Sequence, residues 1–289
     1  MSYNVYWVIN MNKKIIFLDV DGTISSPKNG VSETVKYAIQ KARENGHYVF
    51  VCTGRNKVGV SELKDIEFDG YICSAGGYIE INNQVIYESH LDVEDLKEVR
   101  DVLDKLDVYY NMEATHMTFS DIRLNRMFAL GTLGKNASNS ELDRLVEQQK
   151  DNYNIHTLEE YNENPLPIHK VCFVALNRES LEVIKEKLSY KYHVIIHELF
   201  SSDTINGEFI IKGTNKGNAV REVAKYYNIS IDDTIAFGDS MNDYEMIRAV
   251  KYGVVMENGS AKLKEYASSI CEHIDNDGVY HELKRLNII

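Results

Sequence analysis

The chain has 289 residues, of which 44% are hydrophobic and 26% are charged. This length suits about two domains of ordinary size, and the composition is typical of globular proteins, which excludes disorder and fibrous repeats. Lys and Arg total 32 against 44 Asp and Glu, which gives a formal net charge of −12. Because so acidic a surface repels phosphate backbones, we expect no nucleic-acid partner.

The hydrophobic runs exclude a membrane protein. Runs such as residues 15–18 and 49–52 have the length of strands, whereas a membrane helix needs about 18 apolar residues. Residues 1–10 lack a basic segment and a cleavage-like end, so we predict no signal peptide and regard them as an extension without catalytic importance. We predict a reducing cytoplasm, because no CxxC spacing joins the four cysteines, Cys52, Cys73, Cys172 and Cys271. The oligomeric state stays open.

Both ends of the chain alternate short apolar strands with amphipathic helices. After a strand over Lys14–Leu18, Ser32 offers an N-cap to a helix that ends near Gly46. Further strands are predicted at Tyr48–Cys52, Gly70–Cys73, Thr234–Phe237 and Gly253–Met256, and further helices at about 216–227, after Asn242, and at about 280–286. Continuous apolar strands separated by helices predict a parallel sheet covered on both faces.

The middle of the chain has a different pattern. It begins after a predicted hairpin at residues 78–87 and contains paired strand and helix units. The predicted helices are Val93–Leu106, Glu141–Lys150 and Ser180–Leu188, and the predicted strands are Val108–Met112, His116–Phe119, Lys170–Leu176 and His193–His197. We therefore predict the α/β class: a Rossmann-like, doubly wound parallel sheet formed by residues 1–84 and 205–289, with an inserted α+β domain formed by residues 85–204.

The first strand ends in two carboxylates. Asp19 and Asp21 follow the apolar run 15–18, and their i, i+2 spacing places both on one side of an extended chain. In open α/β sheets, ligands bind at the carboxyl ends of the strands. Two anions this close repel each other unless a cation or a shared proton intervenes, and oxygen ligands suit Mg²⁺. In isolation, a solvated Asp-Gly turn would be the favoured explanation of this pattern.

Three further element ends carry matching chemistry. Thr53-Gly54 follows the second strand and suits a phosphate oxygen, and Lys216 stands at a predicted helix start, where the charge and the helix dipole both attract anions. The strand at 234–237 runs into Gly238–Asp243, which supplies acidic and amide side chains. Each feature alone has a structural explanation as a turn residue, a solvated charge or an N-cap. Together with Asp19 and Asp21, they give four such features in this order along the chain, and this combination favours a single phosphate-binding site.

This arrangement resembles the haloacid dehalogenase (HAD) superfamily of phosphotransferases. Asp19–Thr23 (DxDGT), Thr53-Gly54, Lys216 and Gly238–Asp243 (GDxxND) match its four motifs in order. The insertion between the second and third motifs resembles the type-IIB cap. The residues of the third and fourth motifs are similar to those of the Cof-type phosphatases. The resemblance is specific over roughly residues 14–80 and 205–289, and only architectural in the cap at 85–204.

The resemblance implies roles for individual residues. Asp19 would be the nucleophile and a metal ligand, and Asp21 would be the general acid/base and offer its main-chain carbonyl to Mg²⁺. Asp239 would complete the protein ligands of the metal. The transferring phosphoryl group would be held by Thr53, Gly54, Lys216 and Asn242, with help from the Val20 amide. Asp243 would stand behind them and orient Lys216.

The implied activity is the hydrolysis of small phosphorylated metabolites, such as sugar phosphates, through an aspartyl-phosphate intermediate. One departure concerns Ser74-Ala75-Gly76-Gly77, because the family usually has Asn-Gly-Ala there. The resemblance therefore does not imply a substrate contact of the kind that this Asn would make. The cap would exclude water and recognise the leaving group. Solvated surface is the simpler explanation for His116, Arg123 and Arg126, although each could contact the substrate.

Three other functions compete with this one. A phosphomutase would use the same nucleophile and return the phosphoryl group to the substrate, and a test for bisphosphate activation separates the two. A phospho-accepting receiver carries its aspartate on the third strand, whereas Asp19 follows the first. A binding protein without catalysis is disfavoured because no motif has lost its key residue.

Overall fold

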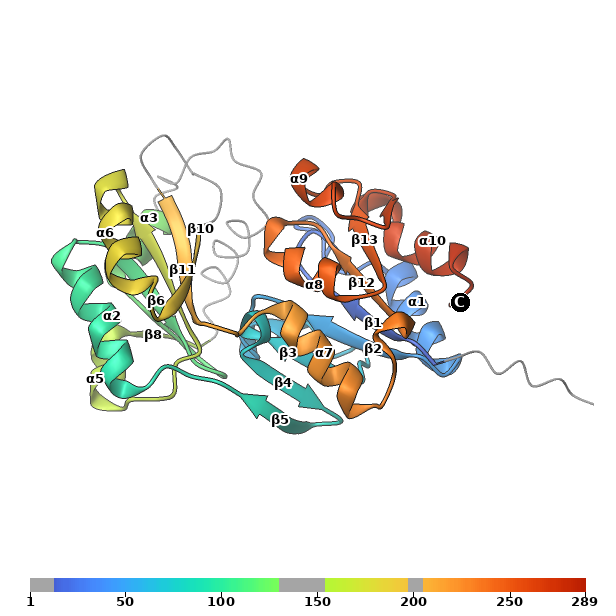
Figure 1. Ribbon diagram of the computed structural model, residues 1–289, viewed down its shortest axis with the longest axis horizontal. Coiled ribbons are helices and arrows are strands. Elements are labelled where there is room, and N and C mark those ends of the chain that lie inside the picture. The colour runs from blue at the N-terminus through green and yellow to red at the C-terminus, as the bar shows by residue number, and fades with distance from the viewer. Residues whose placement is uncertain (1–12, 130–153, 197–204) are drawn as a thin grey trace, which may run out of the picture.

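The computed structural model describes residues 13–129, 154–196 and 205–289, and in it the chain forms two sheets with separate hydrophobic cores. Figure 1 shows the two parts side by side, with the smaller sheet and its helices on the left. The predicted extension at 1–10 and the predicted helix at 141–150 lie outside the described residues. No helix in the described ranges is long and apolar enough to cross a membrane.

The larger sheet has eight strands in the order β14-β13-β12-β1-β2-β3-β4-β5. Their bounds are β1 Ile15–Leu18, β2 Tyr48–Cys52, β3 Gly70–Cys73, β4 Tyr78–Ile81, β5 Gln84–Glu88, β12 Thr234–Gly238, β13 Tyr252–Met256 and β14 Ser269–Cys271. The six strands from β14 to β3 are parallel, and β4 and β5 add an antiparallel edge. The predicted parallel sheet is confirmed.

Helices cover both faces of this sheet, which is why its central strands are apolar throughout. The helices are α1 Glu33–Glu44, α7 Lys216–Tyr226, α8 Tyr244–Ala249, α9 Ala261–Lys264 and α10 Gly278–Arg285. One core packs α1 and α10 against side chains such as Ile16 and Val51, and the other packs α7 and α8 against side chains such as Phe17 and Phe50. The Ser32 side chain caps α1 by accepting the Val35 amide, as the sequence predicts.

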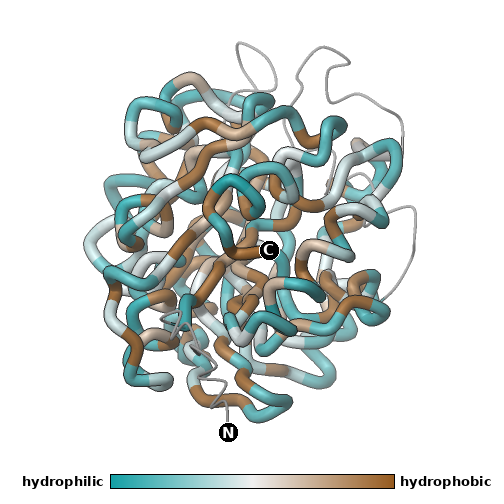
Figure 2. The backbone as a smooth tube through the Cα atoms, turned by 90° about the vertical axis from the view of Figure 1, so that its right-hand side faces the viewer, coloured by the Kyte–Doolittle hydropathy of each residue, from teal (hydrophilic) through white to brown (hydrophobic). Residues whose placement is uncertain are grey.

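The smaller sheet has six strands in the order β10-β11-β9-β6-β7-β8. They are β6 Tyr109–Glu113, β7 Thr118–Ser120, β8 Ile155–Thr157, β9 Lys170–Ala175, β10 Tyr192–Ile196 and β11 Ile205–Ile211, and the helices are α2 Val93–Lys105, α3 Ile122–Ala129, α5 Leu158–Glu163 and α6 Arg178–Leu188. In Figure 1, α2, α5 and α6 lie on the side of this sheet away from the larger one. Figure 2 shows hydrophobic and hydrophilic stretches alternating along the described parts of the chain.

Strand pairing bears on the predicted domain bounds at residues 84 and 205. A tight turn with positive φ at Asn82 and Asn83 folds β5 back onto β4, so β5 pairs with the larger sheet. Strand β11 pairs with β9 and β10 in the smaller sheet. Strand β5, which the predicted bounds assign to the cap, therefore pairs with the core sheet, and strand β11, which they assign to the core, pairs with the cap sheet. We propose that residues 89–92 and 212–215 connect the core to the cap.

Candidate active site

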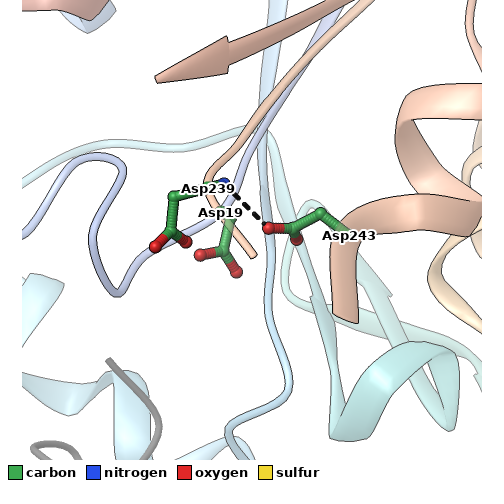
Figure 3. Close-up of side chains that lie close together, drawn as sticks. All are labelled: Asp19, Asp239 and Asp243. Atoms are coloured by element: carbon green, nitrogen blue, oxygen red, sulfur yellow. Dashed lines mark hydrogen bonds between the residues drawn. The ribbon is translucent and has the colours of Figure 1, made fainter. Parts of the chain in front are cut away.

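Three buried carboxylates meet at the carboxyl edge of the larger sheet. Asp19 follows β1, Asp239 follows β12, and Asp243 ends the 3₁₀ turn Met241–Asp243. Their nearest carboxylate oxygens all lie within 4.8 Å of one another, and Figure 3 shows the three side chains converging. The strands bring them together because β1 and β12 are parallel neighbours, and the Asp19 amide donates to the Phe237 carbonyl at 3.0 Å.

Lys216 provides the positive charge that these carboxylates contact. It is the first residue of α7 and is 1% exposed, and Asn215 caps the helix by accepting the Asn218 amide. Its Nζ donates to Asp19 Oδ1 at 2.8 Å and to Asp243 Oδ1 at 2.6 Å, and it lies 3.3 Å from Asn242 Oδ1. Burial alone would lower the pKa of Lys216, but the two carboxylates raise it well above its ordinary value, so the side chain stays charged.

The negative charge exceeds what one lysine can balance. Burial, with a further contribution from Asp243, raises the pKa of Asp19 to about 8 although Lys216 opposes this effect. Burial and the charge of Asp19 likewise raise the pKa of Asp239 well above its ordinary value. Carboxylates so destabilised by burial and mutual repulsion fit a divalent cation with oxygen ligands.

The hydrogen bonds of Asp243 set it apart from the other two carboxylates. Its Oδ1 accepts from Lys216, and its Oδ2 accepts the amides of Asp239 at 3.0 Å and Ser240 at 3.2 Å. Both oxygens are therefore occupied by the protein, which leaves Asp19 and Asp239 as the carboxylates better placed to bind a cation.

Gly22 is required by the close approach of Asp239. A Cβ at this position would lie 2.3 Å from Asp239 Oδ2, and the backbone has a φ of +76°. The carbonyl of Val20 accepts the amides of Thr23, Ile24 and Ser25, so the chain turns immediately after Asp19. The turn explains why glycine follows the second aspartate of the first motif.

The side chain of Asp21 lies outside the carboxylate group and is bound by an arginine. Arg55 donates from Nη2 to Asp21 Oδ1 at 2.6 Å and from Nε to Asp21 Oδ2 at 2.9 Å. Its Nη1 contacts the Gly59 carbonyl and Glu62. Two parallel hydrogen bonds of this kind fix the orientation of a carboxylate as well as its position.

The Thr53-Gly54 segment is fixed by backbone hydrogen bonds to the loop after β3. The Thr53 hydroxyl accepts the Arg55 amide at 3.2 Å, the Ser74 amide donates to the Arg55 carbonyl at 2.7 Å, and the Ala75 amide donates to the Thr53 carbonyl at 3.1 Å. Ser74 and Ala75 both adopt positive φ, which costs energy for residues with a Cβ. Ala75, where the family usually has asparagine, offers only a methyl group.

A cleft of about 130 Å³ opens between this edge of the core and the smaller sheet. Gly54, Ala75, Lys216 and Asn242 line it from the core, and His193, Ile195, Glu208 and Ile210 line it from β10 and β11. The three surface residues considered from the sequence, His116, Arg123 and Arg126, do not line it. His116 and Arg126 are exposed, and Arg123 pairs with Asp107 and Asp121.

Three residues of this region were not identified from the sequence as functional. Arg55 directly follows Thr53-Gly54, so its position was a usable signal. Lys170 opens a buried strand, where a charge is costly unless it is paired, and its Nζ donates to the Gly54 carbonyl at 2.8 Å. Glu208 interrupts the apolar strand β11, and no motif marked it.

Comparisons with known proteins agree with this geometry. The family profile of the haloacid dehalogenase-like hydrolases matches residues 16–283. The putative phosphatase YkrA of Bacillus subtilis is 26% identical over 96% of this chain and 100% of its own length. The 5-amino-6-(5-phospho-D-ribitylamino)uracil phosphatase YwtE of the same organism is 27% identical over 94% of this chain and 98% of its own.

Among solved structures, the HAD subclass IIB sugar phosphatase BT4131 has a TM-score of 0.74 at 22% identity and covers 96% of this chain and 100% of its own. That likeness confirms the predicted fold, a parallel α/β core with an inserted α+β cap. The family match extends over both the motifs and the insertion. The chain belongs to the haloacid dehalogenase-like hydrolases.

Proposed function

We propose that the protein is a Mg²⁺-dependent phosphatase that hydrolyses small phosphorylated metabolites through an aspartyl-phosphate at Asp19. The observation that carries this proposal is the pairing of Asp19 with Lys216 at 2.8 Å in a buried site beside Asp239. A carboxylate nucleophile and a phosphate ester are both anionic, so they can approach each other only where positive charge offsets their repulsion. The relatives named as phosphatases support the reaction class.

The side chains around Asp19 suit the binding of a phosphoryl group. Thr53, Gly54, Lys216 and Asn242, with the Val20 amide, would donate hydrogen bonds to its oxygens. The contacts between Lys216 and Asp243 would hold the ammonium in position. Donors fixed in advance by the protein stabilise the charge that develops in the transition state without reorganising during the reaction.

Asp19, Asp239 and the main-chain carbonyl of Asp21 would hold the Mg²⁺. When bound, the ion would neutralise phosphoryl oxygens and shield the nucleophile. The charge imbalance described above supports a cation at this place, because burial and neighbouring carboxylates raise the pKa of both Asp19 and Asp239.

Two displacements at phosphorus complete the reaction. A carboxylate oxygen of Asp19 bonds to phosphorus while the ester oxygen leaves, and Asp21 donates a proton to the departing alkoxide. Asp21 then takes a proton from water, whose oxygen attacks phosphorus and displaces Asp19, which releases inorganic phosphate. Arg55 would position Asp21 through its paired hydrogen bonds, which take one acceptor site on each carboxylate oxygen and leave the others for the two proton transfers.

The proposal is tested by measuring inorganic phosphate release from a panel of phosphorylated metabolites, with Mg²⁺ and with excess chelator. We expect Mg²⁺-dependent release from at least one compound. Full activity in chelator would contradict the metal assignment. A phosphomutase, the alternative within the superfamily, would instead depend on a bisphosphate activator and leave the total phosphoester unchanged.

We also propose that the protein works in the reducing cytoplasm, without a nucleic-acid or membrane partner. All four cysteines are buried free thiols, and burial raises the pKa of Cys73 and Cys271 to about 12. Such thiols are protonated at neutral pH and serve as small apolar side chains.

A further inference from the structure

Lys170 begins β9 on the face of the cap sheet that is turned toward the core. Glu113 lies directly opposite it on β6, and Glu208 lies on β11 opposite the residue two positions further along β9. Because every second side chain of a strand points to the same side, the three charged groups share this face. The Nζ of Lys170 lies 3.0 Å from Glu208 Oε2 and 3.4 Å from Glu113 Oε2, and the Lys170 side chain has no exposed surface. The two carboxylates therefore balance the buried charge and hold the ammonium in place.

The same ammonium makes a contact that crosses from the cap to the core. Its Nζ donates to the Gly54 carbonyl at 2.8 Å, in the segment proposed to bind the phosphoryl group. The carbonyl of Gly54 and the amide of Arg55 belong to one peptide group, and that amide donates to the Thr53 hydroxyl at 3.2 Å. A charged donor at the carbonyl polarises the peptide group and strengthens its amide as a donor. Lys170 therefore acts on the Thr53 hydroxyl through a single peptide group.

The hydrogen bond from this amide determines how the Thr53 hydroxyl can be used. A hydroxyl donates one hydrogen bond and accepts up to two. Because the hydroxyl oxygen of Thr53 accepts the Arg55 amide, its proton is available to an oxygen of a phosphoryl group. Thr53 is 1% exposed, so water competes little for that proton. A donor whose direction is fixed in this way needs no reorganisation when substrate binds.

A second set of contacts joins the same loop to the cap. Asn56 is 1% exposed, and its Nδ2 donates to the Ala114 carbonyl at 2.9 Å, in the turn between β6 and β7. The Val58 amide donates to the Thr115 carbonyl of that turn at 3.1 Å. The loop after β2 is thus hydrogen-bonded to the cap at residues 54, 56 and 58. Its position relative to the rest of the core depends on the cap.

We propose that Lys170 is a positioning residue through which the cap holds the phosphate-binding segment Thr53-Gly54, with Asn56 as a second point of attachment. The cap then acts on the phosphoryl end of the substrate through the main chain of the core, whatever the leaving group is. This inference rests on the proposed phosphatase function and adds a residue of the cap to those that set the phosphate site.

The first test measures the binding of inorganic phosphate, which has no leaving group, by calorimetry with Mg²⁺ present. Lys170→Met is combined with Glu113→Gln. The wild-type cluster has one lysine and two glutamates and the double variant has one glutamate, so the net charge stays at −1. We expect the Kd of phosphate to rise about tenfold, the loss typical of a hydrogen bond from a charged group.

Glu113→Gln alone is the matched control, because it keeps Lys170 and its contact with Gly54. It should change the Kd of phosphate by less than about threefold. An equal Kd in the double variant and in this control would overturn the inference. If the wild-type protein did not bind phosphate, the inference and the proposed function would fail together.

The second test distinguishes this role from recognition of the leaving group. With Mg²⁺ present, kcat/KM is measured for p-nitrophenyl phosphate and for an alkyl phosphate that the wild-type protein hydrolyses. The double variant should lose the same factor with both esters, within about threefold, because they share the phosphoryl group. A loss confined to one ester would contradict the proposed role. If the wild type bound phosphate but hydrolysed no ester, the proposed function would fail, and calorimetry would still decide the role of Lys170.

A double-mutant cycle tests the route through Thr53. Thr53→Val removes the hydroxyl and keeps the shape of the side chain. In this background the Lys170 substitution should raise the Kd of phosphate by less than about threefold, instead of about tenfold. Asn242→Ala, in the turn after β12, is the control background, and there the Lys170 substitution should keep its full effect. Equal effects in both backgrounds would show that Lys170 does not act through Thr53.

Melting temperatures show which variants fold, because Lys170 is buried among charged groups. If the double variant does not fold, Asn56→Ser decides the inference, since it loses the contact with Ala114 and leaves the charged cluster intact. The Kd of phosphate should then rise about threefold or more. Asn45→Ser removes a similar contact, to the Ile288 carbonyl, and should leave the Kd unchanged. An unchanged Kd in Asn56→Ser as well would show that the cap does not position the phosphate-binding segment.

Discussion

The two aspartates of the first motif occupy different electrostatic surroundings although they are two residues apart. Asp19 is buried among Asp239, Asp243 and Lys216, whereas Asp21 is bound by the Arg55 guanidinium. A nucleophile needs an exposed lone pair close to positive charge, and an acid/base group needs a fixed orientation toward the leaving oxygen. The division of roles that we propose follows from this difference.

Arg55 offers a prediction at the residue scale. Arg55→Lys keeps the charge but loses the paired hydrogen bonds to Asp21, so an acid positioned by them should act less well. We expect kcat to fall about tenfold for an alkyl phosphate and much less for nitrophenyl phosphate, whose leaving group needs little protonation. Steady-state kinetics with the two substrates measure the difference.

Arg43→Lys is the matched control for this substitution. Arg43 makes a similar paired contact with Asp69, at 3.2 and 3.3 Å, away from the active site. Arg43→Lys should leave the ratio of kcat for the alkyl phosphate to kcat for nitrophenyl phosphate unchanged. A ratio that is also unchanged in Arg55→Lys would show that Arg55 does not position Asp21 for catalysis.

At the scale of elements, the placement of Lys216 depends on how α7 packs against α8. A Cβ on Gly217 would lie 2.4 Å from the carbonyl oxygen of Glu245 in α8. Real Cβ atoms do not approach backbone so closely, so the glycine allows the helices to touch. The first turn of α7 therefore lies where Lys216 can reach Asp19 and Asp243.

Gly217→Ala should separate the two helices. We expect it to lower the free energy of unfolding by about 1–3 kcal/mol, as overpacked sites usually do, and to lower kcat because Lys216 moves with the helix. Urea denaturation and phosphate release measure both effects. Arg221→Ala, at an exposed position of the same helix, should change stability by less than about 0.5 kcal/mol, and equal stability of the two variants would contradict the packing argument.

The elements of the core could be predicted from sequence because local signals and burial agree there. Ser32 caps α1 as expected, and the four apolar residues of β1 form a strand buried on both faces. The motif residues met at one sheet edge because parallel strands end together. The ends of the core strands differ from the predicted ends by one residue at β12 and at β13.

The cap was less predictable because its signals are tertiary. Strand β11 reads Ile-Asn-Gly-Glu-Phe-Ile-Ile, and the polar run 206–208 hides a strand that only pairing with β9 and β10 reveals. The paired contact between Arg55 and Asp21 spans 34 residues, and that between Lys170 and Gly54 spans 116. No local sequence pattern predicts contacts between residues so far apart in the chain. The contacts of Arg55 and Lys170 are therefore seen only in the folded structure.

At the scale of the whole molecule, the buried carboxylates couple metal binding to folding and to pH. Burial and Asp243 raise the pKa of Asp19 to about 8, whereas an aspartate in an unfolded chain titrates near 4. Between these values the metal-free folded protein holds a proton that the unfolded chain has released. The contribution of Asp19 to the stability of the metal-free folded protein therefore decreases as the pH rises from about 4 to about 8.

A divalent cation should replace that proton. We expect Mg²⁺ to raise the melting temperature more at pH 8 than at pH 6, because at the lower pH it competes with protons for Asp19. Thermal unfolding with Mg²⁺ and with chelator at both pH values measures the shift. Asp239→Asn should reduce the Mg²⁺ effect at pH 8, and an equal Mg²⁺ shift at both pH values would contradict the assigned ligands.

The central claim is that Asp19 accepts the phosphoryl group and Asp21 moves the protons. It is tested most directly by rapid-quench measurement of phosphoenzyme during turnover of nitrophenyl phosphate by two variants. In Asp21→Asn, the first step needs little acid but the second lacks its base, so phosphoenzyme should accumulate. In Asp19→Asn none should form. Phosphoenzyme in Asp19→Asn, or its absence from Asp21→Asn with equal rate losses for alkyl and aryl phosphates, would contradict the mechanism.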